Sequence, residues 1–323
     1  MTRPSRSERV LVIKLGALGD MVLALGPFAA IRRHHPTAFI ALLTTAAYAE
    51  LGERSGFFDD VFVDRRPGWR DIGGWLGLRR KLRAGHFDRI FDLQGNDRTG
   101  MYRRLLWPSA PVWFSEGKRD RRSHALDRHA ATLSKAGIEG TPLPDLAFMK
   151  ADVSDFRLPK RYALLAPGAA LHRPAKRWPA ERYGELADIL AGRAITSVVL
   201  GSKADAAAAR AVQAACPSAM DLTDRTSLFD IPELARGALV AVGNDTGPMH
   251  LIAAAGCPSV VLFSSASDPA LSAPIGPKVT VLRRGSLAQL SAEEVAAAVD
   301  VVATASITNA SSKAPALSPN IRP

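Results

Sequence analysis

The sequence predicts an α/β protein made of doubly wound parallel sheets in two domains. Short apolar runs of strand length alternate with helix-forming segments along most of the chain, as they do in doubly wound sheets. One complete strand–loop–helix–strand unit spans Leu239 to Phe263, where Pro248 suits a first helical position and Gly256 suits a helix end. The length of 323 residues exceeds one ordinary core and suits two domains of about 150 residues each.

The first half begins with an apolar strand that runs directly into Gly16-Ala17-Leu18-Gly19-Asp20. The elements expected around this loop are the strand Val10–Leu15, the helix Met21–Arg33, the strands Phe39–Leu43, Val61–Val63 and Arg89–Leu93, and a basic helix around Leu76–Leu82. The pattern Gly16-x-x-Gly19 does not complete the dinucleotide fingerprint G-x-G-x-x-G, and no acidic residue follows the strand that ends at Leu43. We therefore expect no nicotinamide cofactor.

A second series of strands and helices follows a linker that we place at Leu143–Arg161, where the chain carries prolines and mixed charge. The expected domains are therefore residues 1–150 and 151–304. The elements of the second domain are the strands Tyr162–Ala166 and Ser197–Leu200, the helices Ala180–Leu190, Ala204–Ala215 and Leu228–Ala235, the unit described above, and a last helix Ser291–Thr304. Residues 305–323 lack an apolar period, so a disordered tail is expected.

Composition indicates a cytoplasmic protein. The two cysteines, Cys216 and Cys257, lie far apart and form no metal-binding or disulfide pattern, which fits a reducing compartment. The polar start MTRPSRSERV leads into a short strand and does not resemble a secretory signal. No stretch approaches the roughly 18 consecutive apolar residues that a membrane-spanning helix needs.

Positive charge is concentrated in the first half of the chain. Residues 1–150 carry 25 Lys and Arg against 16 Asp and Glu, a net charge of +9, whereas residues 151–323 carry 17 against 15, a net charge of +2. Most of the excess lies in two segments, Arg65–Arg83 and Arg98–Arg122. A single arginine there is most simply a solvated charge, but two such runs favour a binding face for carboxylates or phosphates. Nucleic acid is a weaker candidate, because no nucleic-acid module accompanies the charge and aromatic residues are only 7%.

The loop Gly243–Gly247 is a candidate anion site. It leads into a helix whose free backbone N–H groups and dipole favour an anion, most often a phosphate, and His250 lies one turn into the same helix. The alternative is that this helix only covers the sheet. Lys176 lies in a loop before another helix, where a phosphate-binding lysine would be, although loop lysines are commonly just exposed.

Asp20 is the candidate catalytic carboxylate. It stands beyond the carboxyl end of the first strand, where open α/β sheets bind ligands. It could simply cap the following helix, as most aspartates in this position do. Alternatively, the helix dipole keeps the carboxylate ionised, so that it can take a proton from a hydroxyl group.

Taken together, these segments resemble glycosyltransferase family nine, the heptosyltransferases of lipopolysaccharide core assembly. The matching segments, in the order in which the family has them, are VLVIKLGALGDMVLALGPF at Val10–Phe28, DLQGN at Asp92–Asn96, HALDRHAATLSKAGI at His124–Ile138, PGAALHRPAKRWPAERY at Pro167–Tyr183, TSLFDIPELARGA at Thr226–Ala238 and GNDTGPMHLIAAAGCPSVVLF at Gly243–Phe263. The resemblance extends over roughly residues 10 to 300, and its last motif is quite specific.

This resemblance implies a GT-B architecture of two Rossmann-like domains that face each other across a cleft. The first domain would bind the acceptor and the second the nucleotide sugar. The family's transfer inverts the anomeric centre and needs neither metal nor cofactor, and this chain has no Asp-x-Asp pair, the usual metal–diphosphate clamp of the other main transferase fold.

The family's functional residues map onto specific positions of this chain. By position, Asp20 matches the proposed general base and Lys176 the lysine that contacts phosphate and assists catalysis. The positions that we assign to the donor and its phosphates are Gly16, Gly19, Lys176, Asp245, Thr246, Gly247 and His250. The positions that we assign to the acceptor are Arg65, Arg66, Arg98 and Arg122. The implied donor is ADP-heptose, and the implied acceptor is an anionic glycolipid at the cytoplasmic face of the inner membrane, with which the enzyme would associate peripherally.

Two departures and two alternatives remain. Relatives often have glycine where this chain has Asp221-Leu222-Thr223-Asp224, so its preference for a nucleotide base stays open, and Gly26 before Pro27 leaves the shape of the first helix open. A nucleotide-sugar epimerase of the same architecture would need no second-substrate face, so the basic first domain disfavours it. A catalytically idle binding homologue would be expected to have lost Asp20 or Lys176, and both are present.

Overall fold

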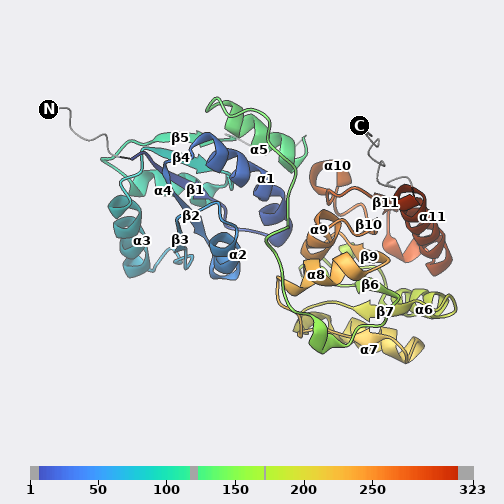
Figure 1. Cartoon of the computed structure of the whole chain (residues 1–323). Helices are drawn as coiled ribbons and strands as arrows, with labels where there is room; N and C mark the ends of the chain where they lie inside the picture. Colours follow the sequence, from blue (N-terminus) through green and yellow to red (C-terminus); the bar gives the residue numbers. More distant parts are fainter. Residues whose placement is uncertain (1–6, 117–122, 171, 312–323) are drawn as a thin grey trace, which may run out of the picture. The chain divides into compact units, whose positions relative to one another are not determined.

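The computed structural model describes residues 7–116, 123–170 and 172–311, with side chains as far as residue 303. The chain forms two compact units (Figure 1). Unit 1 comprises Met1–Ala151 together with Asp268–Ile275, and unit 2 comprises Asp152–Ser267 and the chain from Gly276 onward. The first division falls inside the expected linker. The short segment Asp268–Ile275 differs from expectation, because it belongs to unit 1 although its neighbours in sequence belong to unit 2.

Unit 1 is built on a five-stranded parallel sheet in the order β3-β2-β1-β4-β5. Its strands are β1 (Arg9–Ile13), β2 (Phe39–Thr44), β3 (Asp60–Val63), β4 (Arg89–Asp92) and β5 (Val112–Ser115), and its helices are α1 (Leu18–His34), α2 (Ala49–Arg54), α3 (Ile72–Ala84), α4 (Asp97–Leu105), α5 (Ala125–Ser134) and α10 (Pro269–Ser272). The central strand β1 pairs Val12 with Leu42 of β2 and Phe91 of β4. It is apolar on both faces, as a parallel strand covered on both sides must be.

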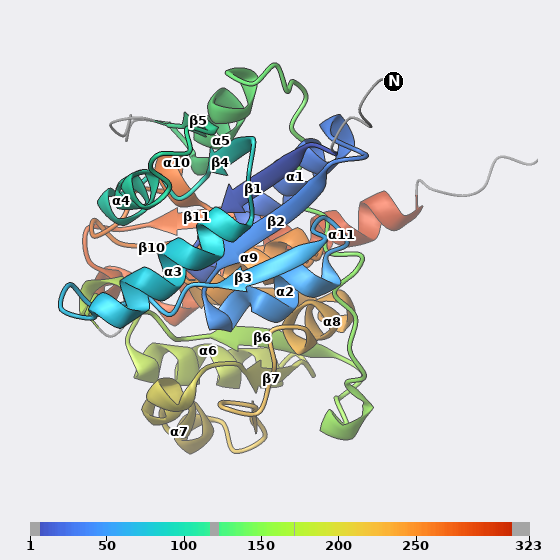
Figure 2. The ribbon, with the colours of Figure 1, turned by 90° about the vertical axis from the view of Figure 1, so that its left-hand side faces the viewer.

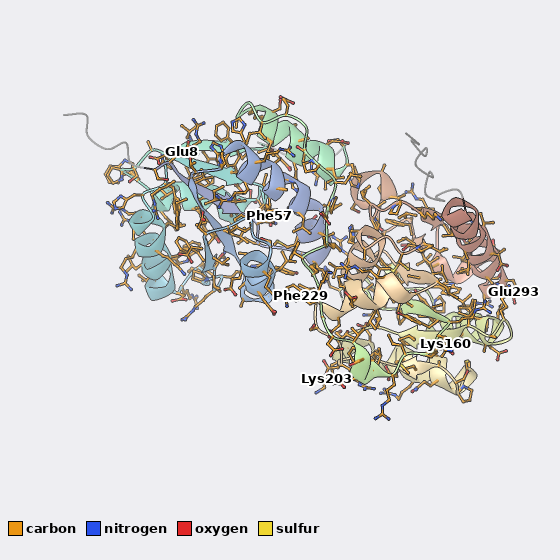
Figure 3. All side chains as sticks on the ribbon, in the orientation of Figure 1. Glu8, Phe57, Lys160, Lys203, Phe229 and Glu293 are labelled. Atoms are coloured by element: carbon orange, nitrogen blue, oxygen red, sulfur yellow. The ribbon has the colours of Figure 1, made fainter. Side chains whose placement is uncertain are left out.

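Helices cover both faces of this sheet. Leu78 and Leu82 of α3 join Tyr102 of α4 in a core with Leu11 and Ile13 of β1, and Figure 2 shows α3 lying across this face. α1 and α5 pack against each other on the other side. Near the start of β1, the carboxylate of Glu8 (labelled in Figure 3) binds Arg89 and His35, which ties the beginning of β4 and the end of α1 to β1.

Unit 2 contains a six-stranded parallel sheet in the order β11-β10-β9-β6-β7-β8. Its strands are β6 (Tyr162–Ala166), β7 (Thr196–Val199), β8 (Met220–Asp221), β9 (Val240–Asn244), β10 (Ser259–Phe263) and β11 (Val279–Arg283), and its helices are α6 (Ala180–Ala191), α7 (Ala206–Ala215), α8 (Asp230–Gly237), α9 (Gly247–Ala254) and α11 (Ala292–Ser311). Side chains of α6, α7 and α11 form one core with β6, β9 and β10. The indole of the buried Trp178 closes this core by donating to the carbonyl of Leu290 over 2.9 Å.

α1 extends beyond its expected bounds at both ends. It begins at Leu18 rather than Met21, and its N-cap is Ala17, a residue type that gives no capping signal in a sequence. Pro27 lies inside the helix without ending it. Gly26 is required by packing, because a Cβ built there would lie 1.8 Å from the carbonyl oxygen of Pro142.

The last helix is longer than expected. α11 continues past Thr304 to Ser311, so the expected boundary of the tail at residue 305 is wrong for the helix. Alanines at positions 303, 305 and 310 favour continuation, since alanine has the highest helix propensity. The rest of the predicted tail, 312–323, lies outside the described residues. Among the helices that the structure describes, none is long and apolar enough to cross a membrane.

We predict that Gly26→Ala destabilises the protein, because the added methyl group has no space beside Pro142. Overpacking of this kind costs about 1–3 kcal/mol of unfolding free energy, and thermal or urea unfolding would measure it. The matched control is Gly77→Ala on α3, where no atom lies within 4 Å of the added Cβ. Replacing a helical glycine by alanine in open space should stabilise by about 0.5–1 kcal/mol. Equal losses in both variants would contradict the packing argument.

Candidate functional site

The loop between β1 and α1 carries Asp20 at the carboxyl edge of the unit 1 sheet. Asp20 is the third residue of α1, and the N-cap is Ala17, so the simple capping alternative is wrong. The side chain is half-buried, and within the described residues no hydrogen bond or ion pair engages its carboxylate. Positions in the first turn of a helix favour negative charge, because the dipole and the free N–H groups are there. Among the described residues, the structure thus presents this carboxylate unengaged in the first turn of a helix.

A hollow of about 730 Å³ lies at the same edge of unit 1. Its lining comes from the loops after β1, β2 and β3: Leu15 to Ala17, Thr45 to Tyr48 and Val63 to Arg66. Arg66 donates to the carbonyl of Leu15 over 3.0 Å. This bond joins the loop after β3 that carries Arg65 and Arg66 (the arginine loop) to the loop between β1 and α1 (the Asp20 loop). Gly16 has a φ of 112°, and a Cβ there would lie 2.6 Å from the Tyr48 ring, so the loop requires glycine.

The predicted site residues of unit 1 are therefore only partly brought together. Arg65, Arg66 and Gly16 line one hollow, whereas Gly19 is buried in the first turn of α1. Both glycines thus lie in unit 1, while Lys176 and the other residues predicted for the donor lie in unit 2. Arg122 lies outside the described residues.

Arg98 is engaged inside unit 1. Its Nε lies 2.6 Å from the Tyr102 hydroxyl and 3.4 Å from the carboxylate of the buried Asp64, and its terminal nitrogens each lie 3.3 Å from the carbonyl of Pro67. The Tyr102 hydroxyl also donates to Asp64. Asp64 in turn accepts from the backbone N–H of Arg66 over 2.8 Å, where φ is 52°. Through Asp64 and Pro67, Arg98 therefore fixes the conformation of the arginine loop.

Three buried charged or polar side chains beneath the Asp20 loop were not among the residues predicted from the sequence. Lys14, at the end of β1, donates to the carbonyl of Leu93 over 2.8 Å, and its Nζ lies 3.4 Å from Nε2 of His129. Glu116 Oε1 lies 3.3 Å from Nδ1 of the same histidine. The signal in the sequence was Lys14 itself, because a lysine beside an apolar strand must find partners once it is buried.

Burial sets the protonation of this cluster. It lowers the pKa of His129 from 6.5 to about 4, the charge of Lys14 acts in the same direction, and the carboxylate of Glu116 opposes both. His129 is therefore neutral near pH 7, and its Nε2 can accept a hydrogen bond from the Lys14 ammonium. Burial also lowers the pKa of Lys14, and the negative charge of Asp20 is the strongest influence that opposes this shift. Lys14 is thus electrostatically coupled to Asp20.

In unit 2 the loop between β9 and α9 brings Lys176 to the start of a helix. The Lys176 ammonium forms an ion pair with the carboxylate of Asp245, and both side chains are largely buried. Thr246 is the N-cap of α9, which begins at Gly247, and the buried His250 lies one turn into that helix. Lys176, Asp245, Thr246, Gly247 and His250 therefore occupy one compact region, as predicted.

Asn244, the last residue of β9, holds this region together. Its Oδ1 accepts from the backbone of Trp178 over 3.0 Å and from the Tyr183 hydroxyl over 3.1 Å. Its Nδ2 donates to the carbonyl of Pro167 over 2.7 Å. One buried amide thus fixes the loop after β6, the Lys176 loop and the end of β9.

A hollow of about 410 Å³ adjoins this loop in unit 2. It lies at the carboxyl ends of β6, β7 and β9, and the residues lining it include Gly168, Ser202, Asp205, Asp224, Thr226, Ser227, Thr246 and Pro248. Asp224, from the loop after β8, lines the hollow with a left-handed backbone (φ 58°). Within the described part of the chain, no group of three or more His, Cys, Asp or Glu is placed to hold a metal ion.

Comparison with known proteins identifies the family. The model of glycosyltransferase family 9 (heptosyltransferase) matches residues 119–298, more than half of the chain. The chain belongs to this family. It is a glycosyltransferase.

Relatives and solved structures agree with this assignment. Lipopolysaccharide heptosyltransferase 2 of Salmonella typhimurium is 26% identical, over 85% of this chain and 88% of the relative. The glycosyl transferase family 9 structure from Veillonella parvula aligns with a TM-score of 0.79 at 21% identity and covers 92% of this chain and 97% of its own. The ADP-heptose heptosyltransferase II structure of Escherichia coli gives 0.77 at 20% identity, covering 93% and 99%. The predicted GT-B fold of two Rossmann-like units is confirmed.

We predict that His129 makes unit 1 less stable in acid. The unfolded chain binds the proton with a pKa near 6.5 and the folded chain only near 4, so falling pH favours unfolding across that window. Between pH 7 and pH 5 the loss should be about 2 kcal/mol.

In His129→Gln, which keeps an amide within reach of Lys14, this loss should be absent. Hydrogen exchange at the amides of β1, corrected for intrinsic rates, would report the stability of unit 1 alone. If both proteins lose the same stability between pH 7 and pH 5, His129 is not the responsible group.

Proposed function

We propose that this glycosyltransferase transfers a heptose from ADP-heptose, with inversion and without a metal, to an anionic glycolipid of the lipopolysaccharide-core type. The observation that carries the proposal is Lys176 held at the N-terminus of α9 by Asp245. A cation and a helix start converge there on one point, which suits the diphosphate of a nucleotide sugar. The activities of similar proteins, which include lipopolysaccharide heptosyltransferase 2 and ADP-heptose heptosyltransferase II, suggest the sugar and the pathway.

In this proposal unit 2 binds the donor. The diphosphate lies against the start of α9, where it competes with Asp245 for the Lys176 ammonium. The nucleoside occupies the adjoining hollow, which has small residues such as Gly168 and Ser202 at its wall. Asp224 stands in the same wall, so its carboxylate can accept hydrogen bonds from the ribose or the base but repels phosphate. With the diphosphate at the start of α9 and the nucleoside in the hollow, the nucleotide would bind in one orientation.

In the same proposal unit 1 supplies the base. The Asp20 carboxylate takes the proton from an acceptor hydroxyl as that oxygen attacks the anomeric carbon. The bond from this carbon to the donor diphosphate breaks on the opposite face, and ADP leaves. Lys176, His250 and the amides of Thr246 and Gly247 stabilise the charge that develops on the leaving phosphate. Lys14 acts as a positioning residue, because it anchors the end of β1 and places a positive charge near Asp20.

Acceptor recognition is proposed for the hollow beside the Asp20 loop. Arg65 and Arg66 line it, and arginine forks suit the carboxylates and phosphates of an anionic glycolipid. Arg98 contributes by holding the arginine loop through Asp64 and Pro67, and Arg122 remains a proposed contact. The excess of positive charge in the first 150 residues also supports peripheral association with the anionic cytoplasmic face of the inner membrane.

The first test of this function is Asp20→Asn. The amide keeps the shape of the side chain but cannot accept the proton, so transfer should fall by at least two orders of magnitude. Donor affinity should stay nearly unchanged, which ligand-induced thermal shift with ADP would show. A variant that retains most of kcat would leave Asp20 without a catalytic role, and one that also loses ADP binding would point to a folding defect.

The second test concerns the donor site. Lys176→Ala and His250→Ala should each weaken donor binding or slow transfer by about 1–3 kcal/mol, the range for a charge-assisted contact. Transfer should persist in EDTA, and a thermal-shift screen of ADP-, UDP- and GDP-sugars should favour the ADP-sugar. Lys160→Ala, an exposed lysine before the amino end of β6 and not among the residues that line the donor hollow, is the matched control and should behave like the wild type. A strict need for Mg²⁺ or Mn²⁺ would contradict the metal-free mechanism.

A further inference from the structure

The outer face of α3 exposes large apolar side chains. Ile72 is 70% exposed and Leu76 is 57% exposed, and they lie one turn apart on the helix. The opposite face, with Leu78 and Leu82, is buried in the core of unit 1. α3 therefore has two apolar faces, only one of which is used by the fold.

Two tryptophans extend this apolar face at its edges. Trp69, in the turn before α3, is 80% exposed, and Trp107 is 72% exposed. The carbonyl of Trp107 lies 3.5 Å from a guanidinium nitrogen of Arg79 on α3, so this residue borders the same helix face. The guanidinium of Arg70 stacks over the ring of Trp69 at 4.3 Å. Leaving these rings in water costs free energy that a partner surface would recover.

A basic hollow continues the stripe along α3. It has a volume of about 490 Å³ and is lined by Leu76, Arg79, Arg80, Arg83, Ala84, His86 and Ser109. No carboxylate is among these lining residues, and within the described chain no Asp or Glu forms an ion pair with its three arginines. The helix positions 72, 76, 79, 80 and 83 follow the 3.6-residue period, so apolar and basic residues share one face. Figure 2 shows this helix lying across the front of the unit 1 sheet, with its outer side toward the viewer.

We propose that this α3 surface, made of Trp69, Ile72, Leu76, Trp107 and the basic hollow, docks on an anionic lipid bilayer. The apolar side chains enter the interface between headgroups and acyl chains, and the hollow receives the phosphate of an anionic headgroup. Exposed tryptophan and aliphatic side chains beside a basic hollow combine burial of apolar area with electrostatic attraction to anionic lipid, the two contributions that hold peripheral helices at a membrane.

Charge complementarity decides between a bilayer and other partners. Three arginines without carboxylate partners around a hollow need a dense array of negative groups, which a leaflet of anionic lipid provides. Single-stranded nucleic acid would need aromatic rings placed along a continuous basic groove, whereas here the basic residues gather in one hollow at one end of the apolar stripe. The biological role of this docking rests on the proposed function, because a glycolipid acceptor would lie in the same membrane. The binding surface itself is inferred from exposure and charge alone.

The experiment measures flotation of the full-length protein with vesicles of phosphatidylcholine alone and with 30% phosphatidylglycerol. Wild-type protein should bind the mixed vesicles at least tenfold more tightly than the neutral ones. Arg79→Glu combined with Arg83→Glu should weaken binding to the mixed vesicles at least tenfold. Ile72→Ser combined with Leu76→Ser should weaken it in low and in high salt, because burial of apolar side chains is not screened.

The matched control reverses the same number of charges in unit 2, at the exposed Lys160 and Arg210, which do not line the donor hollow. It should bind vesicles like the wild type, and all variants should keep the wild-type thermal shift with ADP, which tests the donor site separately. Equal binding of wild type and α3 variants would overturn the proposal, as would equal binding to neutral vesicles. If a soluble probe, inorganic phosphate or a single-stranded oligonucleotide, binds the hollow in an Arg79-dependent way while vesicles do not, the surface serves that ligand instead.

Discussion

All strands of each unit run parallel, and this constraint determines where chemistry can occur. Parallel strands end at one edge of a sheet, so the loops that follow them must gather there. In unit 1 that edge assembles the Asp20 loop and the arginine pair at positions 65 and 66 into one hollow. In unit 2 it assembles the loops after β6, β7 and β9 around another.

Buried polar side chains keep these loops in place. In unit 2 a single amide, Asn244, pairs the backbone N–H of Trp178 and the carbonyl of Pro167 and accepts from the Tyr183 hydroxyl, so it connects the Lys176 loop, the loop after β6 and α6 to the end of β9. In unit 1 Lys14 binds the carbonyl that ends β4, and the neighbouring N–H of Leu15 donates to the side chain of Gln94 over 2.9 Å. Unpaired polar groups inside a protein are costly, so each tether holds its loop in one conformation.

The sequence was informative where a residue has one physical role and ambiguous where several roles fit. The central strands were recognisable because they are apolar on both faces, whereas β5, β8 and β11 were missed. All three are partly exposed edge strands: β5 is an edge of the unit 1 sheet, and β8 and β11 are the two edges of the unit 2 sheet. The loop with Asp245 and His250 could be recognised as a strand-to-helix connection because its motif is local. The Lys14, Glu116 and His129 cluster joins residues far apart in sequence, and no local pattern could show that Arg98 would bind Asp64 instead of facing solvent.

The chain passes between the two units at three points, Ala151/Asp152, Ser267/Asp268 and Ile275/Gly276. In unit 1 the returning segment is held by His124, whose ring nitrogen lies 3.1 Å from the carbonyl of Ala273. The two units are therefore not consecutive in sequence, and no single division of the chain separates them. A fragment that ends at residue 151 would lack α10, and the complementary fragment would carry it as a loop without its packing partner. Dissection of this enzyme, or exchange of its halves with those of relatives, requires grafting residues 268–275 together with the first unit.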